Sequence, residues 1–126
     1  MIVPDTSIWI EFLKQNPTIV PHFSALLKQK QIATIEPIFA ELLFGVRKPA
    51  DKNLILNYWK LLPQLTFTKG TMILSASYAN EQNYHNRGIG LMDACIIKPM
   101  VEVGYKLWTL DKRILKNLEN IHLYNP

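Results

Sequence analysis

Cysteine and histidine are scarce in this chain of 126 residues, which has one cysteine and three scattered histidines. The single Cys95 cannot form an internal disulfide, which is typical of proteins from a reducing compartment. No cluster of cysteine and histidine has the spacing of a zinc site, because His22, His85 and His122 are far apart in the sequence. We expect Cys95 to be a small buried hydrophobic residue.

Long apolar runs and targeting segments are also missing. Glu41, Lys98 and Glu102 interrupt the most apolar stretches, so none reaches the roughly 20 residues that cross a bilayer. The N-terminus has no basic region followed by an apolar block, so no signal peptide is indicated and the cytoplasm is the expected location. No repeat, low-complexity segment or linker is present, and residues 1–126 are expected to form a single domain.

The composition is that of a globular protein with a modest basic excess. Hydrophobic residues make up 48% of the chain, charged residues 19%, and the net charge is +4. This charge is compatible with a polyanionic partner but does not require one. It becomes informative if the acids cluster, because a basic protein with an acidic pocket suggests a cation shared with a polyanion.

Short β-compatible runs alternate with helical patterns along the chain. The runs predict strands at residues 2–5, 31–35, 65–68, 106–110 and 121–124. Helical spacing predicts helices at residues 7–13, 20–30, 37–46, 51–62, 71–85, 92–103 and 111–119. Strands separated by helices indicate an α/β fold, in which a parallel sheet has helices on both faces.

The first predicted strand ends at a carboxylate, Asp5, which Thr6 and Ser7 follow. Its apolar residues predict a central strand that is buried on both faces. Ligands of open α/β sheets collect at the carboxyl ends of strands, so Asp5 is a candidate site residue. The alternative is that Asp5 only caps the next helix, a common use of aspartate.

Three further acids stand in apolar surroundings. Glu41 lies in the helical pattern IFAELLFGV, Asp93 opens the pattern MDACII, and Asp111 follows the strand-like run LWTL. Each has a structural alternative, since Glu41 can pair with a nearby basic residue and the two aspartates can cap helices. Ser7 and Thr109 place hydroxyl groups near two of these acids, as hydrogen-bond donors or as turn formers.

In a parallel sheet, these acids can converge over one edge. Two carboxylates about 4 Å apart repel by about 4 kcal/mol at an effective dielectric of about 20. A group of them therefore needs either a shared proton or a divalent cation. Because all candidate ligands are oxygens, the cation would be Mg²⁺ or Mn²⁺ rather than zinc.

The segments that carry the acids resemble the motifs of PIN-domain ribonucleases, in particular the VapC-type toxins of toxin–antitoxin pairs. These segments are Asp5-Thr6-Ser7, Glu41–Val46, Asp93-Ala94 and Thr109–Asp111, and the resemblance covers essentially the whole chain. It implies a three-layer α/β/α fold with a parallel sheet of about five strands. It further implies a Mg²⁺- or Mn²⁺-dependent endoribonuclease, a homodimer, and an antitoxin protein whose chain occludes the acidic pocket.

The resemblance also assigns roles to residues of this sequence. Asp5 and Asp93 would be the principal metal ligands, and Glu41 and Asp111 would complete the pocket directly or through metal-bound water. Ser7 or Thr109 would orient these acids. Three basic residues are candidates for holding the RNA backbone, with solvated surface roles as the alternative: Arg87, Lys112 and Arg113.

Two features depart from the family pattern. Pro99 falls inside the predicted helix after Asp93, where it should kink the helix or loosen its hydrogen bonding. Lys112-Arg113-Ile114 stands where many members have another acid and a phenylalanine, which leaves the number of metal ions open and makes Asp111 the least secure of the ligands.

Other functions compete with the toxin. A PIN-fold nuclease for RNA processing or DNA structures is one, although the short chain without a recognition domain favours a toxin. A phosphoacceptor receiver-like signalling domain would need adjacent acids after its first strand and an aspartate after its third, and PDT and LTFT supply neither. A catalytically inactive RNA-binding module is disfavoured because all four acids are present.

Overall fold

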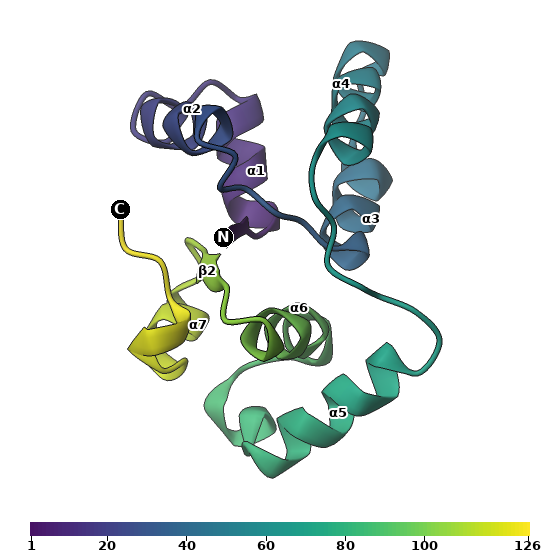
Figure 1. Cartoon of the computed structure of the whole chain (residues 1–126), viewed down its shortest axis with the longest axis vertical. Helices are drawn as coiled ribbons and strands as arrows, with labels where there is room; N and C mark the ends of the chain where they lie inside the picture. The colour runs from purple at the N-terminus through teal and green to yellow at the C-terminus, as the bar shows by residue number, and fades with distance from the viewer.

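Two short parallel strands lie at the centre of the fold, β1 (Ile2–Pro4) and β2 (Lys106–Trp108). The structure is a computed structural model that describes residues 1–126 (Figure 1). Val3 pairs with Leu107, and both side chains are buried. This burial fits the prediction that the N-terminal apolar run is a central strand.

Single parallel bridges extend this central pair on both sides. Ile32 pairs with Ile2, Thr34 with Gln64, and Leu123 with Leu107. Four of the segments expected to be strands therefore lie side by side, in the order 31–35, β1, β2 and 121–124, and the fifth, 65–68, follows the bridging Gln64 and joins only through the N–H of Leu65, which donates to Thr34.

The predicted α/β fold with a parallel sheet is confirmed, but only two of the five expected strands are regular. The outer segments are cut short by neighbouring elements. A helix begins at Glu36, directly after the second segment, and a 3₁₀ helix, Asn120–His122, takes up the first two residues of the last segment, which was expected to be a strand from residue 121. Pro63, beside the third segment, has no N–H to donate.

Seven α-helices and two 3₁₀ helices surround the strands, and they confirm the predicted helices to within a few residues. They are α1 (Thr6–Leu13), α2 (Val20–Lys28), α3 (Glu36–Gly45), α4 (Pro49–Leu61), α5 (Thr71–Glu81), η1 (Tyr84–Arg87), α6 (Leu91–Glu102), α7 (Lys112–Asn117) and η2 (Asn120–His122). In Figure 1, α1 and α2 lie on one side of β2 and α5 and α6 on the other. None of the helices has both the length and the apolar character that crossing a membrane requires.

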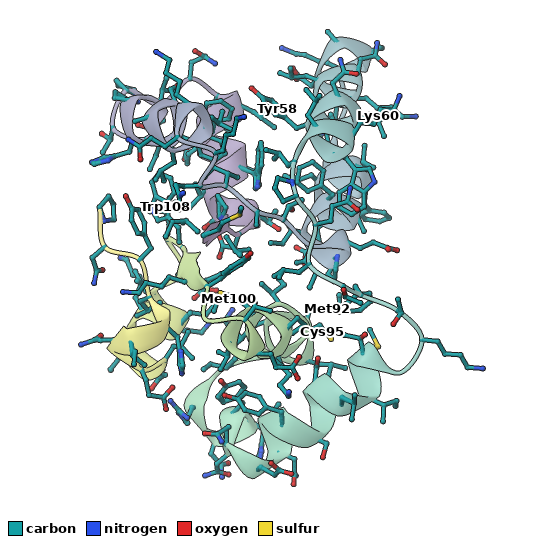
Figure 2. All side chains as sticks on the ribbon, in the orientation of Figure 1. Tyr58, Lys60, Met92, Cys95, Met100 and Trp108 are labelled. Carbon is teal, nitrogen blue, oxygen red and sulfur yellow. The ribbon has the colours of Figure 1, made fainter.

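An aromatic core fixes the direction of α1. Trp9 is fully buried and meets Phe23 and Phe39 edge-on, with ring centroids 4.8 and 5.1 Å apart. Phe12 stacks on Phe23 at 4.0 Å, and Trp108 extends the cluster from β2 towards α2 (Figure 2). Because its buried face is held in this way, α1 presents its N-terminus at the end of β1.

Helix α6 runs without interruption through Pro99, so the expected kink does not end the helix. Proline has no N–H, and the carbonyl of Cys95 one turn earlier therefore lacks its helical donor. Cys95 is fully buried, as predicted, and faces α5 (Figure 2). The backbone defect thus lies in the part of α6 that is packed in the core.

Candidate functional site

Asp5 lies at the junction of β1 and α1. Its backbone N–H donates to the carbonyl of Trp108 on β2 at 2.9 Å. One carboxylate oxygen accepts hydrogen bonds from the Ser7 hydroxyl at 2.5 Å and from the backbone N–H of Ile8 at 3.3 Å, and the other accepts one from the Thr109 hydroxyl. Asp5 is therefore the N-cap of α1, and it is also oriented by two hydroxyl groups from opposite ends of the chain.

Burial raises the pKa of the Asp5 carboxyl above its ordinary value of 3.8, and the hydrogen bonds from Ser7 and Thr109 lower it in part. A pKa raised by burial means that the charged form has lost water without full compensation. No lysine or arginine forms a salt bridge with Asp5. A cation that binds beside Asp5 would therefore stabilise the charged carboxylate.

Hydroxyl groups join the ends of β1 and β2 into one network. Thr109 donates to Asp5 and accepts from the backbone N–H of Asp111 at 3.0 Å. Ser7 likewise donates to Asp5 and accepts from the N–H of Leu110 at 3.0 Å. The network fixes the spacing between Asp5 and the segment that carries Asp111.

Asp111 is the N-cap of α7, where its carboxylate accepts from the backbone N–H of Arg113 at 2.9 Å. Asp93, the third residue of α6, accepts from the N–H of Gly90 at 3.2 Å and so closes the start of that helix. Burial raises the pKa of Asp93, and the charge of Asp111 raises it further. The carboxylate of Asp111 thus disfavours the charged form of Asp93, while the backbone N–H of Asp111 is linked to Asp5 through the Thr109 hydroxyl.

Glu41 stands apart from the aspartates. It is exposed on α3, and its carboxylate accepts a hydrogen bond from the Thr6 hydroxyl at 3.4 Å. It forms no salt bridge, so the alternative of a partner lysine or arginine is not found. Sequence reasoning missed the role of Thr6, although its position next to Asp5 was a usable signal.

No group of three or more acidic, histidine or cysteine side chains lies close enough to hold a metal ion without rearrangement. The acids instead form a series, in which Thr109 links Asp5 to Asp111, Asp111 interacts with Asp93, and Thr6 links Glu41 to the start of α1. The ligand type still fits Mg²⁺ or Mn²⁺, since all donors are oxygens. Mg²⁺ commonly keeps several waters and needs only one or two carboxylates.

Of the basic candidates, Arg87 is engaged within the protein. It donates to the carbonyls of Gln82 at 3.1 Å and of Asn117, and it pairs with Glu119 at 3.0 Å. Its guanidinium also lies over the ring of Tyr84 at 5.3 Å. These contacts tie η1 to the end of α7, which is a structural role.

Lys112 and Arg113 remain beside the acids. Both are exposed at the start of α7, and the Arg113 guanidinium lies 3.5 Å from the Asp111 carboxylate. No contact of the Lys112 side chain holds it within the protein, so it is free to meet a polyanion.

Residues 2–120 match the family described as the PIN domain. The chain belongs to the PIN-domain family. This membership confirms the resemblance seen in the sequence and argues against the receiver-like alternative. No curated protein matches the chain.

Three solved structures share the fold of this PIN domain. VapBC2 from Rickettsia felis, solved bound to a promoter DNA fragment, has a TM-score of 0.75 and 21% identity over 99% of this chain and 98% of that one. VapBC-1 from nontypeable Haemophilus influenzae has a TM-score of 0.72 and 20% identity over 99% and 98%. FitAcB from Neisseria gonorrhoeae has a TM-score of 0.66 and 18% identity over 99% and 97%. Identities this low establish the common fold.

Proposed function

We propose that this PIN domain is a Mg²⁺- or Mn²⁺-dependent endoribonuclease and the toxin of a toxin–antitoxin pair. One observation carries the proposal: the buried Asp5 carboxylate is oriented by Ser7 and Thr109, and Thr109 links it to the backbone N–H of Asp111, where the two central strands end. Family membership and the shared fold with VapBC2, VapBC-1 and FitAcB support it.

Different residues of this chain would have different roles in the site. Asp5 and Asp93 would hold the ion, and Glu41 and Asp111 would reach it through water. When bound, the ion would supply an activated water and neutralise charge on the phosphate. The Ser7 and Thr109 hydroxyls keep the Asp5 carboxylate in one orientation, which preserves the geometry of a ligand.

The RNA backbone would approach over the start of α7. Lys112 and Arg113 are exposed there, next to Asp111. Their charges would attract phosphates to an edge that is otherwise acidic.

The antitoxin would bind in the pocket beside Glu41. This pocket, about 310 Å³, lies between α1, α3 and α4 and has an apolar floor of Ile10, Leu13, Leu42, Val46 and Ile55. An apolar segment of a partner chain suits such a floor. Thr6 and Glu41 line the same pocket, so a chain bound there would extend over the approach to Asp5.

A second copy of the chain would cover part of α5. Met72, Ile73 and Leu74 are three consecutive exposed apolar residues near its start, and Ile73 is 73% exposed. Exposed apolar side chains gathered on one short segment favour a protein contact, so we place the homodimer interface there.

The decisive experiment compares Asp5→Asn and Asp93→Asn with the native protein in RNA cleavage with Mg²⁺ or Mn²⁺. Both substitutions keep the side-chain shape and remove a ligand charge. We expect activity to fall by more than the roughly 10- to 100-fold loss that follows mutation of groups around metal ligands. Glu81→Gln, an exposed acid on α5, is the control and should cleave normally.

Three outcomes would overturn the proposal or its toxin assignment. Cleavage by either aspartate variant at the native rate would remove the acids from the chemistry. Native protein that binds RNA without cutting it would favour the inactive RNA-binding module, an alternative consistent with the absence of a preformed three-ligand cluster. A processing or DNA-structure nuclease would instead cleave but bind no antitoxin.

A further inference from the structure

A second pocket, of about 200 Å³, opens between the end of α5, η1 and the start of α6. Residues from all three elements and from the loop before α6 line it, among them Ala76, Ala79, Asn80, Tyr84, His85 and Gly90. Pockets that hold drug-sized ligands measure about 300–1,000 Å³. This smaller pocket therefore suits a single small ring system.

Gly90 connects this pocket to the proposed cleavage site. It lines the pocket, and its backbone N–H donates to the Asp93 carboxylate at 3.2 Å. Two residues earlier, the stem of Arg113 packs beside Gly88, where a Cβ atom would lie 3.8 Å from Cδ of Arg113. The loop at residues 88–90 therefore borders the pocket, Asp93 and the basic start of α7.

Glycine at position 90 is required neither by the backbone nor by packing. Its φ of −82° is open to any residue, and beyond its chain neighbours a Cβ atom there would meet only an oxygen of Asp93, at 3.6 Å. The missing side chain instead leaves room for a flat ligand to approach the backbone closely. Ala76 and Ala79 on α5 add two more short side chains to the lining.

Two polar side chains of the pocket are free to contact a ligand. Asn80 and His85 are both exposed, and neither side chain makes a hydrogen bond within the protein, whereas the neighbouring Asn86 donates to Asn83. An amide and a neutral imidazole each offer both a donor and an acceptor. The edges of nucleobases present the same mixture of donors and acceptors.

Tyr84, the residue before His85, is buried in the lining and held on two sides. The ring of Tyr78 meets it edge-on with centroids 5.8 Å apart, and the Arg87 guanidinium lies over it at 5.3 Å. Arg87 is itself paired with Glu119 at 3.0 Å. Because η1 is fixed in this way, His85 is presented at a defined position.

We propose that this pocket receives one base of the RNA, next to the phosphate that is cleaved, and that Asn80 and His85 determine which base is accepted. This inference rests on the proposed nuclease function and deepens it. Single-stranded RNA suits the pocket, since its unstacked bases can turn out of the strand and bond to side chains along their edges. Lys112 and Arg113 would hold the phosphates beside the same loop.

The first test measures cleavage by the full-length protein, with Mn²⁺, of single-stranded RNA oligonucleotides that differ in one base at each position around the cut. We expect the native protein to prefer one base at a single position next to the cut. Asn80→Ala and His85→Ala should each reduce that preference about 10-fold and leave other positions unchanged. Gln82→Ala removes an exposed amide outside the pocket and is the matched control, which should keep the native preference.

The second test needs neither metal nor cleavage. The four nucleoside monophosphates are titrated into the native protein, and binding is read from the NMR shifts of the backbone amides. The monophosphate of the preferred base should shift the amides of Ala79, His85 and Gly90. Gly90→Ala, which adds a methyl group to the pocket, should weaken that binding.

The inference is overturned if the native protein cleaves without a base preference, if Asn80→Ala and His85→Ala keep the native preference, or if no monophosphate shifts these amides. Each of these results leaves the proposed nuclease function standing. Native protein that cleaves no RNA would instead reject the proposed function, and the titration alone would then decide whether the pocket binds a base. A variant that loses all cleavage is judged by the same titration, after circular dichroism has verified its fold.

Discussion

At the scale of single residues, the burial of Asp5 suits its proposed function but lowers the stability of the fold. Burial and the hydrogen bonds from Ser7 and Thr109 suit its carboxylate to the proposed role of a ligand, but the same burial penalises its charge. With no cationic partner in the chain, this cost remains in the folded protein until a cation arrives.

Asp5→Asn is therefore expected to raise the melting temperature at pH 7 in metal-free buffer while it abolishes cleavage. The folded protein binds the Asp5 proton more tightly than the unfolded chain does, so ionisation of Asp5 destabilises the fold above its raised pKa. The advantage of the asparagine variant should shrink as the pH falls and disappear below the ordinary value of 3.8. Thermal melts at several pH values measure this.

Glu81→Gln is the control for these melts and should change stability by no more than about 0.5 kcal/mol, as exposed substitutions usually do. A lower melting temperature for Asp5→Asn at pH 7 would contradict the argument. It would show that the cap hydrogen bonds of the carboxylate outweigh its desolvation.

The sequence predicted the neighbours of Asp5 better than it predicted the position of Glu41. Ser7 and Thr109 sit next to strand ends, and the pairing of parallel strands brings such ends together. Glu41 lies on a helix, and how far α3 stands from the strand edge depends on side-chain packing that sequence patterns do not encode. The hydroxyl of Thr6, which spans that gap, was therefore missed.

At the scale of elements, α6 has the proposed ligand Asp93 in its first turn and a missing backbone hydrogen bond in its interior. Its first turn holds Asp93, while Pro99 further along removes one backbone hydrogen bond. The helix nevertheless continues because it is packed against α5 along its length (Figure 1). Tertiary packing has overridden the local preference that the sequence predicted.

Pro99→Ala is expected to stabilise the protein by about 1 kcal/mol. Proline in a helix interior costs about 3 kcal/mol relative to alanine, and the truncation removes two buried carbons worth about 0.8 kcal/mol each. Urea denaturation measures the difference. A net loss of stability would mean that the fit of the proline ring against its neighbours matters more than the missing hydrogen bond.

Sheet length was predictable only in part. The apolar runs located the buried segments, because burial demands such residues in central positions, but the bridge expected within 65–68 lies one residue earlier, at Gln64. Whether an apolar run forms a regular strand also depends on the elements that flank it. The helix that begins at Glu36 and the 3₁₀ helix Asn120–His122 each shorten one of the runs. Local sequence does not decide such competition between adjacent elements.

At the scale of the whole molecule, the exposed apolar residues predict self-association through α5. Ile73→Lys should convert a dimer in solution to a monomer, because a buried unpaired charge is costly at an interface. Light scattering coupled to size exclusion measures the mass. Ile121→Lys is the matched control, since Ile121 on η2 is 72% exposed against 73% for Ile73, and it should remain dimeric. A monomeric native protein, or equal behaviour of the two variants, would refute the assignment.

The distance along the chain between Asp5 and Thr109 has a consequence for biosynthesis. A ribosome makes Asp5 well before the hydroxyl that orients it, which comes 104 positions later in the chain. Until Lys106–Trp108 has left the exit tunnel, β1 lacks this neighbour in the sheet. Until both segments have been made, the proposed site cannot assemble, so a chain fragment that carries Asp5 without β2 and Thr109 should cleave no RNA.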